Sequence, residues 1–352
     1  MINPRALSLI KTAVMLLIIA AGLYFSVRGV DFPELGRSFR NVNYLVALSI
    51  IPVILLSHLV RAHRWKVILS NIAPGIGMSP LFSGVIIGYF MNNIISRSGE
   101  FVRPFVTAQQ DDRTPYSSLL GSIIVERFID TVGLLLIVAA VLIFDTTLFK
   151  GFADTNSSPN IEKNIRDLMY VTIILGIAFI VIAPSRLGYR LAVIFSAPLP
   201  AKIREKLLDI FSKLQKGFGA IRNGRQAMIV FLETGLIYFL YMIPLYIMFF
   251  AVPSGQQSTP SLFDALRVLT VTSLAYAVAP TPGALGVFHY TARTATMSML
   301  HFTEADAVAY ATIMHFINFA TVMVVGSVYM MTLKLSFQGL LRGKHANDTT
   351  IR

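Results

Sequence analysis

Residues 119–144 read LLGSIIVERFIDTVGLLLIVAAVLIF, an apolar stretch long enough to cross a bilayer as a helix. It carries three charged residues, Glu126, Arg127 and Asp130, about two to three turns from its start. An ionisable group in the hydrocarbon layer costs about 2.5–3.5 kcal/mol on insertion scales. Such groups persist where they face a polar cavity, pair with each other or have a function. The stretch therefore predicts a transmembrane helix that carries a polar site.

The composition indicates the same class of protein. The chain has 352 residues, of which 55% are hydrophobic and 14% are charged, whereas about a quarter of the residues of a soluble domain are charged. The net charge of +12 does not predict nucleic-acid binding, because basic residues gather in the cytoplasmic loops of membrane proteins. The lack of cysteine excludes disulfides and thiolate metal sites. We expect an all-α polytopic membrane protein.

Further apolar segments accompany 119–144. They are residues 12–27, 44–60, 81–95, 168–183, 228–252, 263–279, 283–300 and 305–333. The first has no convincing cleavage site at its end, so we expect an uncleaved span rather than a signal peptide.

Loop charge predicts the orientation. The most basic stretch is 186–225, and basic residues also follow the second segment at 61–66 and the last segment at 334–344. Each is expected on the cytoplasmic side. The prediction is a multi-pass protein of the inner, cytoplasmic membrane with both termini in the cytoplasm.

With this orientation, two regions cannot be simple crossings. Segment 81–95 must begin and end inside, which favours a re-entrant segment. Segments 263–279 and 283–300 together make an even number of crossings, as a hairpin or as a pair broken at 280–286. The prediction is about six full spans plus two broken or re-entrant segments, which is typical of an inverted repeat with its substrate site near the midplane.

The expected domain organisation is simple. Residues 1–337 form a single transmembrane domain, within which 184–226 is a basic cytoplasmic loop. Apolar residues recur at helical spacing in 202–225, so this loop is expected to contain an amphipathic helix. Residues 338–352 form a cytoplasmic tail that is expected to be disordered.

A first candidate site lies after segment 81–95. Arg97, Glu100 and Arg103 are spaced three residues apart and would share one face of a helix. Guanidinium groups bind phosphate in a bidentate way, so these residues are candidate ligands of a lipid phosphate or headgroup, with Glu100 as counter-ion. The alternative is a salt-bridge network that anchors a loop.

Glu126, Arg127 and Asp130 form the second candidate. Glu126 and Asp130 share a helical face, and Arg127 is spaced to pair with Asp130. Their expected roles are pairing with Arg97 or Arg103, proton coupling, or holding the broken segment. A purely structural ion network is the alternative.

The third candidate is a break at 280–286, reading PTPGALG. Its prolines and glycines cannot continue a helix. The predicted hinge residues are Gly99, Pro280, Pro282, Gly283 and Gly286. An ordinary turn between two spans is the alternative.

Several cations and histidines lie near these segments. Arg293, four residues after His289, is a further candidate phosphate ligand, and His289 is a candidate for a structural or proton-coupling role. His58, Arg61, Arg64 and Lys66 are interpreted as a snorkelling cuff at the inner end of the second span, with headgroup binding as the alternative.

His315 and Asn318 are expected to form an interhelical hydrogen-bonded pair, with a proton relay as the alternative. No metal spacing, nucleotide loop or nucleophile motif is present, so no metal or cofactor is expected.

Three motifs carry a resemblance to a known family. They are Asn92–Asn93 with Arg97–Pro104, then Glu126–Asp130, then Ala279–Phe288. In this order they resemble the lysylphosphatidylglycerol synthase transmembrane-region family, whose members are often called flippase-like. The resemblance implies a membrane protein related to the lipid-translocating half of the bifunctional lysyl-lipid enzymes. Only residues 334–352 follow the last span, so the soluble aminoacyl-transfer domain of those enzymes is not expected here.

Two positions depart from the family pattern. Ser96 stands where the family often has proline, and His289 stands where it often has an acidic residue. The resemblance therefore does not imply that this protein carries a lysyl-lipid.

The expected function is translocation of a phospholipid or a polyprenyl-phosphate-linked lipid, by a transporter-like protein rather than an enzyme. Two alternatives stay open. One is a membrane transferase that uses a polyprenyl-phosphate-linked donor, with Glu126 and Asp130 as base or metal ligands, and the other is a regulatory subunit that transports nothing. The expected partner is the lipid substrate, without nucleic acid, and a homo-oligomer is a further expectation.

Overall fold

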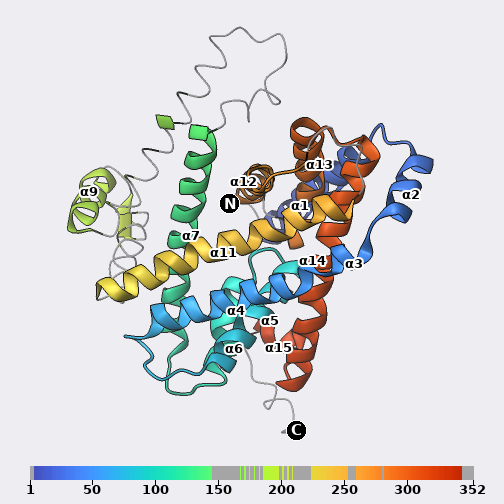
Figure 1. Cartoon of the computed structure of the whole chain (residues 1–352). Coiled ribbons are helices and arrows are strands. Elements are labelled where there is room, and N and C mark those ends of the chain that lie inside the picture. Colours follow the sequence, from blue (N-terminus) through green and yellow to red (C-terminus); the bar gives the residue numbers. More distant parts are fainter. Residues whose placement is uncertain are drawn as a thin grey trace. The chain divides into compact units, whose positions relative to one another are not determined.

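The computed structural model describes residues 4–144, 185–197, 223–252, 259–279 and 281–342, together with isolated positions between 167 and 208; the side chains of residues 4–11, 341 and 342 are not included. Every regular element in this part of the chain is helical. In chain order the elements are α1 (Pro4–Val27), α2 (Phe32–Asn41), α3 (Tyr44–Leu48), α4 (Ile50–Leu69), α5 (Met78–Ile94), α6 (Gly99–Ala108), α7 (Tyr116–Phe144), α9 (Arg186–Ser196), α11 (Gly224–Ala251), α12 (Leu262–Val278), the 3₁₀ turn η1 (Pro282–Ala284), α13 (Val287–Leu300), α14 (Glu304–Thr332) and α15 (Phe337–Arg342) (Figure 1).

The chain divides into two compact units. Unit 1 comprises Met1–His58, Ile86–Val102 and Phe239–Arg352, and unit 2 comprises Leu59–Val85 and Arg103–Tyr238. Each unit is described by itself.

In unit 1, α1 and α2 are joined by a sharp bend. Apolar helix 12–27 meets α2 at 87°, and the chain turns at Gly29, which has a φ of +84°. Glycine adopts this left-handed conformation without the steric cost that a side chain would add. Pro33 stands in the first turn of α2, where its missing N–H is not needed.

The centre of unit 1 is α13, which packs against α1, α12 and α14. The close approach of α1 depends on two glycines, because a Cβ atom at Gly22 would lie 2.6 Å from the carbonyl carbon of Gly286. Tyr310 of α14 is fully buried and donates a hydrogen bond to the carbonyl of Leu245 at 2.9 Å. At the α1–α13 crossing, Gly22 and Gly286 leave no room for larger residues.

In unit 2, α4, α7 and α11 share a small apolar cluster of Ile68, Val125 and Val230. The first turns of α5 lie against α6, where the Thr107 hydroxyl donates to the carbonyl of Pro80 at 3.1 Å. A Cβ atom at Gly84 would lie 3.1 Å from the carbonyl oxygen of Arg103, so this contact also depends on a glycine.

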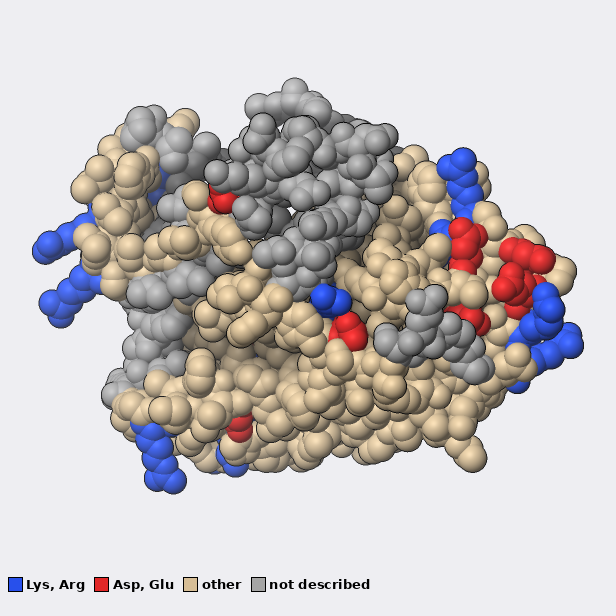
Figure 2. All heavy atoms as spheres, turned by 45° about the horizontal axis from the view of Figure 1, so that its top comes forward, with Lys and Arg blue, Asp and Glu red and all other residues tan. Residues whose placement is uncertain are grey.

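Four helices are long and apolar enough to span a membrane, by length and composition among the described residues. They are Tyr44–Leu69, Tyr116–Phe144, Gly224–Ala251 and Glu304–Thr332, and the bent pair of 12–27 with α2 would make a fifth. Large apolar side chains such as Leu45, Phe144 and Val278 are exposed. In the view of Figure 2 most of the described surface carries no acidic or basic side chain, as expected where lipid surrounds a protein.

The all-helical prediction is confirmed, and the count of six full spans is not. Segment 168–183 lies mostly outside the described residues, as do the loop helix predicted at 202–225 and the outer part of the tail. Segment 81–95 is found as α5, and 263–279 and 283–300 as α12 and α13, but their re-entrant path through a membrane stays a prediction. Helix α15 extends to Arg342, into the start of the expected tail. The disorder expected of the tail stays a prediction.

Candidate functional site

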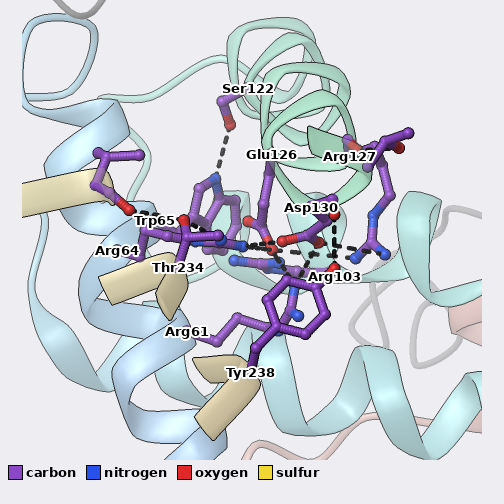
Figure 3. A network of polar contacts seen from close by, with 12 residues as sticks. Arg61, Arg64, Trp65, Arg103, Ser122, Glu126, Arg127, Asp130, Thr234 and Tyr238 are labelled. Atoms are coloured by element: carbon purple, nitrogen blue, oxygen red, sulfur yellow. Dashed lines mark hydrogen bonds and ion pairs between the residues drawn. The ribbon is translucent and has the colours of Figure 1, made fainter. Parts of the chain in front are cut away.

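A cluster of charged side chains lies inside unit 2, at the meeting of four helices (Figure 3). Helix α4 provides Arg61 and Arg64, α6 provides Arg103, and α7 provides Glu126, Arg127 and Asp130. Helix α11 adds the hydroxyl groups of Thr234 and Tyr238. We call the six ionised residues the arginine–carboxylate cluster.

Glu126 is the centre of the cluster. Its Oε1 accepts hydrogen bonds from Arg61 at 2.6 Å and from Arg103 at 2.9 Å, and Nη2 of Arg64 lies 3.5 Å away. Its side chain is completely buried. One carboxylate oxygen thus attracts three guanidinium groups, a geometry that positions all three.

Asp130 lies one turn further along α7 and binds two of the same arginines. Arg64 donates to it at 2.5 Å and Arg61 at 2.9 Å, while Arg127 lies 3.7 Å away on the same helix. The Tyr238 hydroxyl donates to the backbone carbonyl of Asp130 at 2.6 Å. Nη1 of Arg64 donates a hydrogen bond to the Thr234 hydroxyl at 2.9 Å.

Positive charge exceeds negative charge in the cluster, because four arginines face two carboxylates. Arg61, Arg64 and Arg103 are each at most 4% exposed. Buried charges are normally paired and fully hydrogen-bonded. Arg103 departs most from this rule, since both Nε and Nη2 of its guanidinium have no hydrogen-bond partner within the described part of the chain, whereas Arg64 lacks one at Nε alone. Oε2 of Glu126 lacks one as well.

Trp65 fixes the plane of Arg103. The guanidinium carbon lies 3.9 Å from the centre of the indole ring, a cation–π contact. The ring is itself completely buried and its Nε1 donates to the Ser122 hydroxyl at 2.7 Å. Arg103 is therefore held by Trp65 on one face and by Glu126 at Nη1, while its Nε–Nη2 edge faces no protein acceptor among the described residues.

The comparisons with known proteins are consistent with this membrane architecture. A family model described as the lysylphosphatidylglycerol synthase TM region matches residues 12–326. The chain belongs to this family. Comparison with curated proteins and with solved structures gives no match. As a member of the lysylphosphatidylglycerol synthase TM region family the chain is a multi-pass membrane protein.

Within this family member, the predicted face of Arg97, Glu100 and Arg103 does not form. Helix α6 begins only at Gly99, and Arg97 lies in the preceding turn with a φ of +62°. Arg97 is exposed and Glu100 is partly buried, and both belong to unit 1. Arg103 belongs to the cluster in unit 2. Helical spacing could not reveal this, because the helix breaks between the first two residues of the motif.

The interpretation of Arg61 and Arg64 as part of a snorkelling cuff is wrong. Helix α4 continues through them to Leu69, and both side chains are buried against α7 rather than exposed to water. The sequence carried one signal for this, since Arg61 and Arg64 are three residues apart and share a helical face. Trp65, the other residue missed, is the single tryptophan of the chain.

Arg293 lies in unit 1 and is engaged by the protein itself. Its guanidinium donates to the carbonyls of Phe25 at 2.6 Å and Arg28 at 3.1 Å, which end helix α1, and lies 3.3 Å from Glu304. A cation at the carbonyl end of a helix is favourable. Arg293 therefore stabilises the α1–α2 bend. Its role as a phosphate ligand stays a prediction.

The 281–286 turn forms as an irregular backbone. Gly283 and Gly286 have φ values of +56° and +78°, and Pro282 begins the 3₁₀ turn η1. Pro280 lies outside the described residues. The Gly283 carbonyl accepts from Nε2 of His315 at 2.8 Å, so the interhelical bond expected of His315 goes to the backbone. His289 is buried, with its ring centre 4.5 Å from that of His315.

Gly99, the remaining predicted hinge residue, starts α6. A Cβ atom there would clash with the carbonyl of Gly88 in α5, and its own N–H donates to the Asn92 side chain at 2.8 Å. The geometry gives Gly99 a role in close packing. Whether it also moves as a hinge stays a prediction.

The position of Trp65 makes the cluster observable by fluorescence. We expect emission typical of an apolar environment and little quenching by iodide, because the ring is fully buried. Arg103→Gln removes the cation above the ring and should shift the emission, whereas Arg113→Gln, at an exposed arginine outside the cluster, should not. Equal spectra for the two variants would contradict the stacking of Arg103 on Trp65.

Proposed function

We propose that this protein is a lipid flippase or a closely related lipid transporter, and that the arginine–carboxylate cluster binds the phosphate of its cargo. The cargo is a phospholipid or a polyprenyl-phosphate-linked lipid. One observation carries the proposal, namely the unpartnered Nε–Nη2 edge of buried Arg103 within a cluster that has more arginines than carboxylates. The family, a membrane region linked to flippase-like function, agrees with it.

The chemistry of that edge fits a phosphate. Nε–H and one Nη2–H point to the same side of the planar guanidinium and together bind two oxygens of a phosphate or carboxylate. Glu126 and Trp65 hold the group before a ligand arrives, so little side-chain entropy is lost on binding. In this proposal Arg103 contacts the phosphate, while Glu126 and Asp130 position the arginines and Arg127 pairs with Asp130.

The same geometry disfavours the transferase alternative. A general base or metal ligand needs a carboxylate whose lone pairs are available. Both oxygens of Asp130 contact Arg61 or Arg64, and Oε1 of Glu126 faces three arginines. Oε2 of Glu126 has no partner among the described residues, but the arginines around this carboxylate stabilise its ionised form. Carboxylates held between arginines are poor bases, so we propose no enzymatic activity for the cluster.

The remaining expectations become part of the proposal. The protein resides in the inner membrane with both termini in the cytoplasm, and its partner is the lipid. Arg97, Glu100 and Arg293, which lie in unit 1, are proposed as further headgroup-binding residues.

Translocation by the reconstituted protein tests the proposal. Liposomes containing the full chain and a headgroup-labelled phospholipid are treated with a membrane-impermeant reductant, and the rate at which protected label becomes accessible is measured. Arg103→Ala is expected to lower this rate about tenfold or more, because charge-assisted hydrogen bonds contribute about 1.5–3 kcal/mol.

The matched control is Arg113→Ala, which removes an arginine of unit 2 that is 73% exposed and paired with Asp111. It should leave the rate unchanged. Equal rates for wild type and a well-folded Arg103→Ala variant, across phospholipid and polyprenyl-phosphate cargoes, would overturn the assignment of the cluster as the phosphate site.

A further inference from the structure

The charge of the cluster carries information about the cargo. Four arginines and two carboxylates leave a formal charge of +2, and of the six residues only Arg127 is strongly exposed, at 42% of its side chain. The titratable groups on the neighbouring turns of α4 and α11 are His63, Glu233 and Tyr238. His63 and Glu233, on α4 and α11, contact each other, and the Tyr238 hydroxyl donates to a backbone carbonyl.

An excess of buried positive charge is costly unless an anion offsets it. A phosphodiester headgroup such as that of phosphatidylglycerol brings one negative charge. A phosphate monoester brings about two at neutral pH, since its second ionisation has a pKa of about 6. A lysyl-lipid headgroup adds positive charge and would increase the excess.

We infer that the cluster selects lipids whose phosphate carries two negative charges, that is, a terminal phosphate monoester or a diphosphate, over phosphodiester lipids. This inference rests on the proposed function and narrows its cargo. Arg103 supplies the bidentate edge, and the excess charge shared by Arg61, Arg64 and Arg127 supplies the discrimination between one and two negative charges.

Trp65 provides the readout, because it is the single tryptophan and stacks on Arg103. The full chain is placed in nanodiscs of phosphatidylcholine and titrated at pH 8 with short-chain phosphatidic acid, a monoester, or with short-chain phosphatidylglycerol, a diester. The monoester is expected to bind at least about tenfold more tightly, because one further charge lies among partly desolvated arginines.

Acidification gives an independent check. At pH 5 the monoester loses most of its second charge, so its affinity should fall towards that of the diester. Phosphatidylglycerol keeps its charge over this range and reports any change in the protein itself. An unchanged preference for the monoester at pH 5 would overturn selection by charge.

Phosphate monoesters are also soluble metabolites, and glycerol 3-phosphate distinguishes the two sources. The lipid inference predicts that it fails to displace phosphatidic acid at equal concentration. Displacement at equal concentration would show that the site takes a soluble phosphate and would overturn the lipid assignment.

Two substitutions complete the design. Arg127→Gln removes a charge from the exposed side of the cluster and should reduce the preference for the monoester while the protein stays folded. Arg113→Gln is the matched control and should keep the preference. Equal affinities of wild type for the two lipids, both reduced by Arg103→Gln, would overturn this inference and leave the proposed function intact. If neither lipid changes Trp65 emission, the proposed function itself fails.

Discussion

Replacing Glu126 with glutamine is expected to destabilise the protein by about 3–5 kcal/mol, the cost of removing one partner from a buried ion pair. The substitution keeps the volume of the side chain and removes its charge. Arg61 and Arg64 retain Asp130, but Arg103 loses its only carboxylate contact among the described residues. We expect the melting temperature of the detergent-solubilised protein to fall by about 5–10 °C, followed through the fluorescence of Trp65.

Glu304→Gln is the matched control, because Glu304 also pairs with an arginine but is 44% exposed. Exposed ion pairs contribute at most about 1 kcal/mol, so its melting temperature should fall only slightly. Similar falls in melting temperature for Glu126→Gln and Glu304→Gln would show that burial does not determine how much Glu126 contributes to stability. Addition of an anionic lipid should widen the difference between wild type and Glu126→Gln if the lipid binds the arginines of the intact cluster.

Gly286→Ala is expected to be at least as damaging. The residue has a φ of +78°, which costs an alanine about 1–2 kcal/mol, and its Cβ atom would lie 2.6 Å from the carbonyl oxygen of Ile19 in α1. The obstacle is backbone, so no rotamer change relieves it. We expect loss of monodisperse protein in size-exclusion chromatography, or a fall in melting temperature comparable to that of Glu126→Gln.

Two other glycines sharpen this test. Gly22→Ala places a methyl group on the opposite side of the same contact and should have a similar effect. Gly235 lies within α11 with nothing within 4 Å of a Cβ atom, so Gly235→Ala should be neutral or stabilising by up to about 1 kcal/mol. A well-behaved Gly286→Ala variant with wild-type stability would contradict the close packing of α1 on α13.

Much of the helical architecture could be predicted because long apolar segments have few alternatives in a membrane. The expected segments 119–144, 228–252 and 305–333 differ by only a few residues from α7, α11 and α14. The unusual charge of Glu126 and Asp130 also identified the carboxylate half of the cluster, because helical spacing places both on one face of α7.

The arginine half of the cluster could not be predicted in the same way. Arg61 and Arg64 follow an apolar segment, where a cytoplasmic end and a buried helix look alike in sequence. The difference depends on Glu126 and Asp130, more than 60 positions later in the chain. For Arg97 the obstacle was local, since the turn at 95–98 separates it from the helix that carries Arg103.

The lengths of α12 and α13 have a consequence for the surrounding lipid. These helices have 17 and 14 residues, which makes them about 26 and 21 Å long, whereas the hydrocarbon core of a bilayer is about 30 Å thick. Where apolar helices are shorter than the hydrocarbon core, the bilayer around them can become locally thinner to reduce the hydrophobic mismatch. We expect thinning beside unit 1, which would shorten the distance over which a crossing headgroup is separated from water and lower the barrier to its passage.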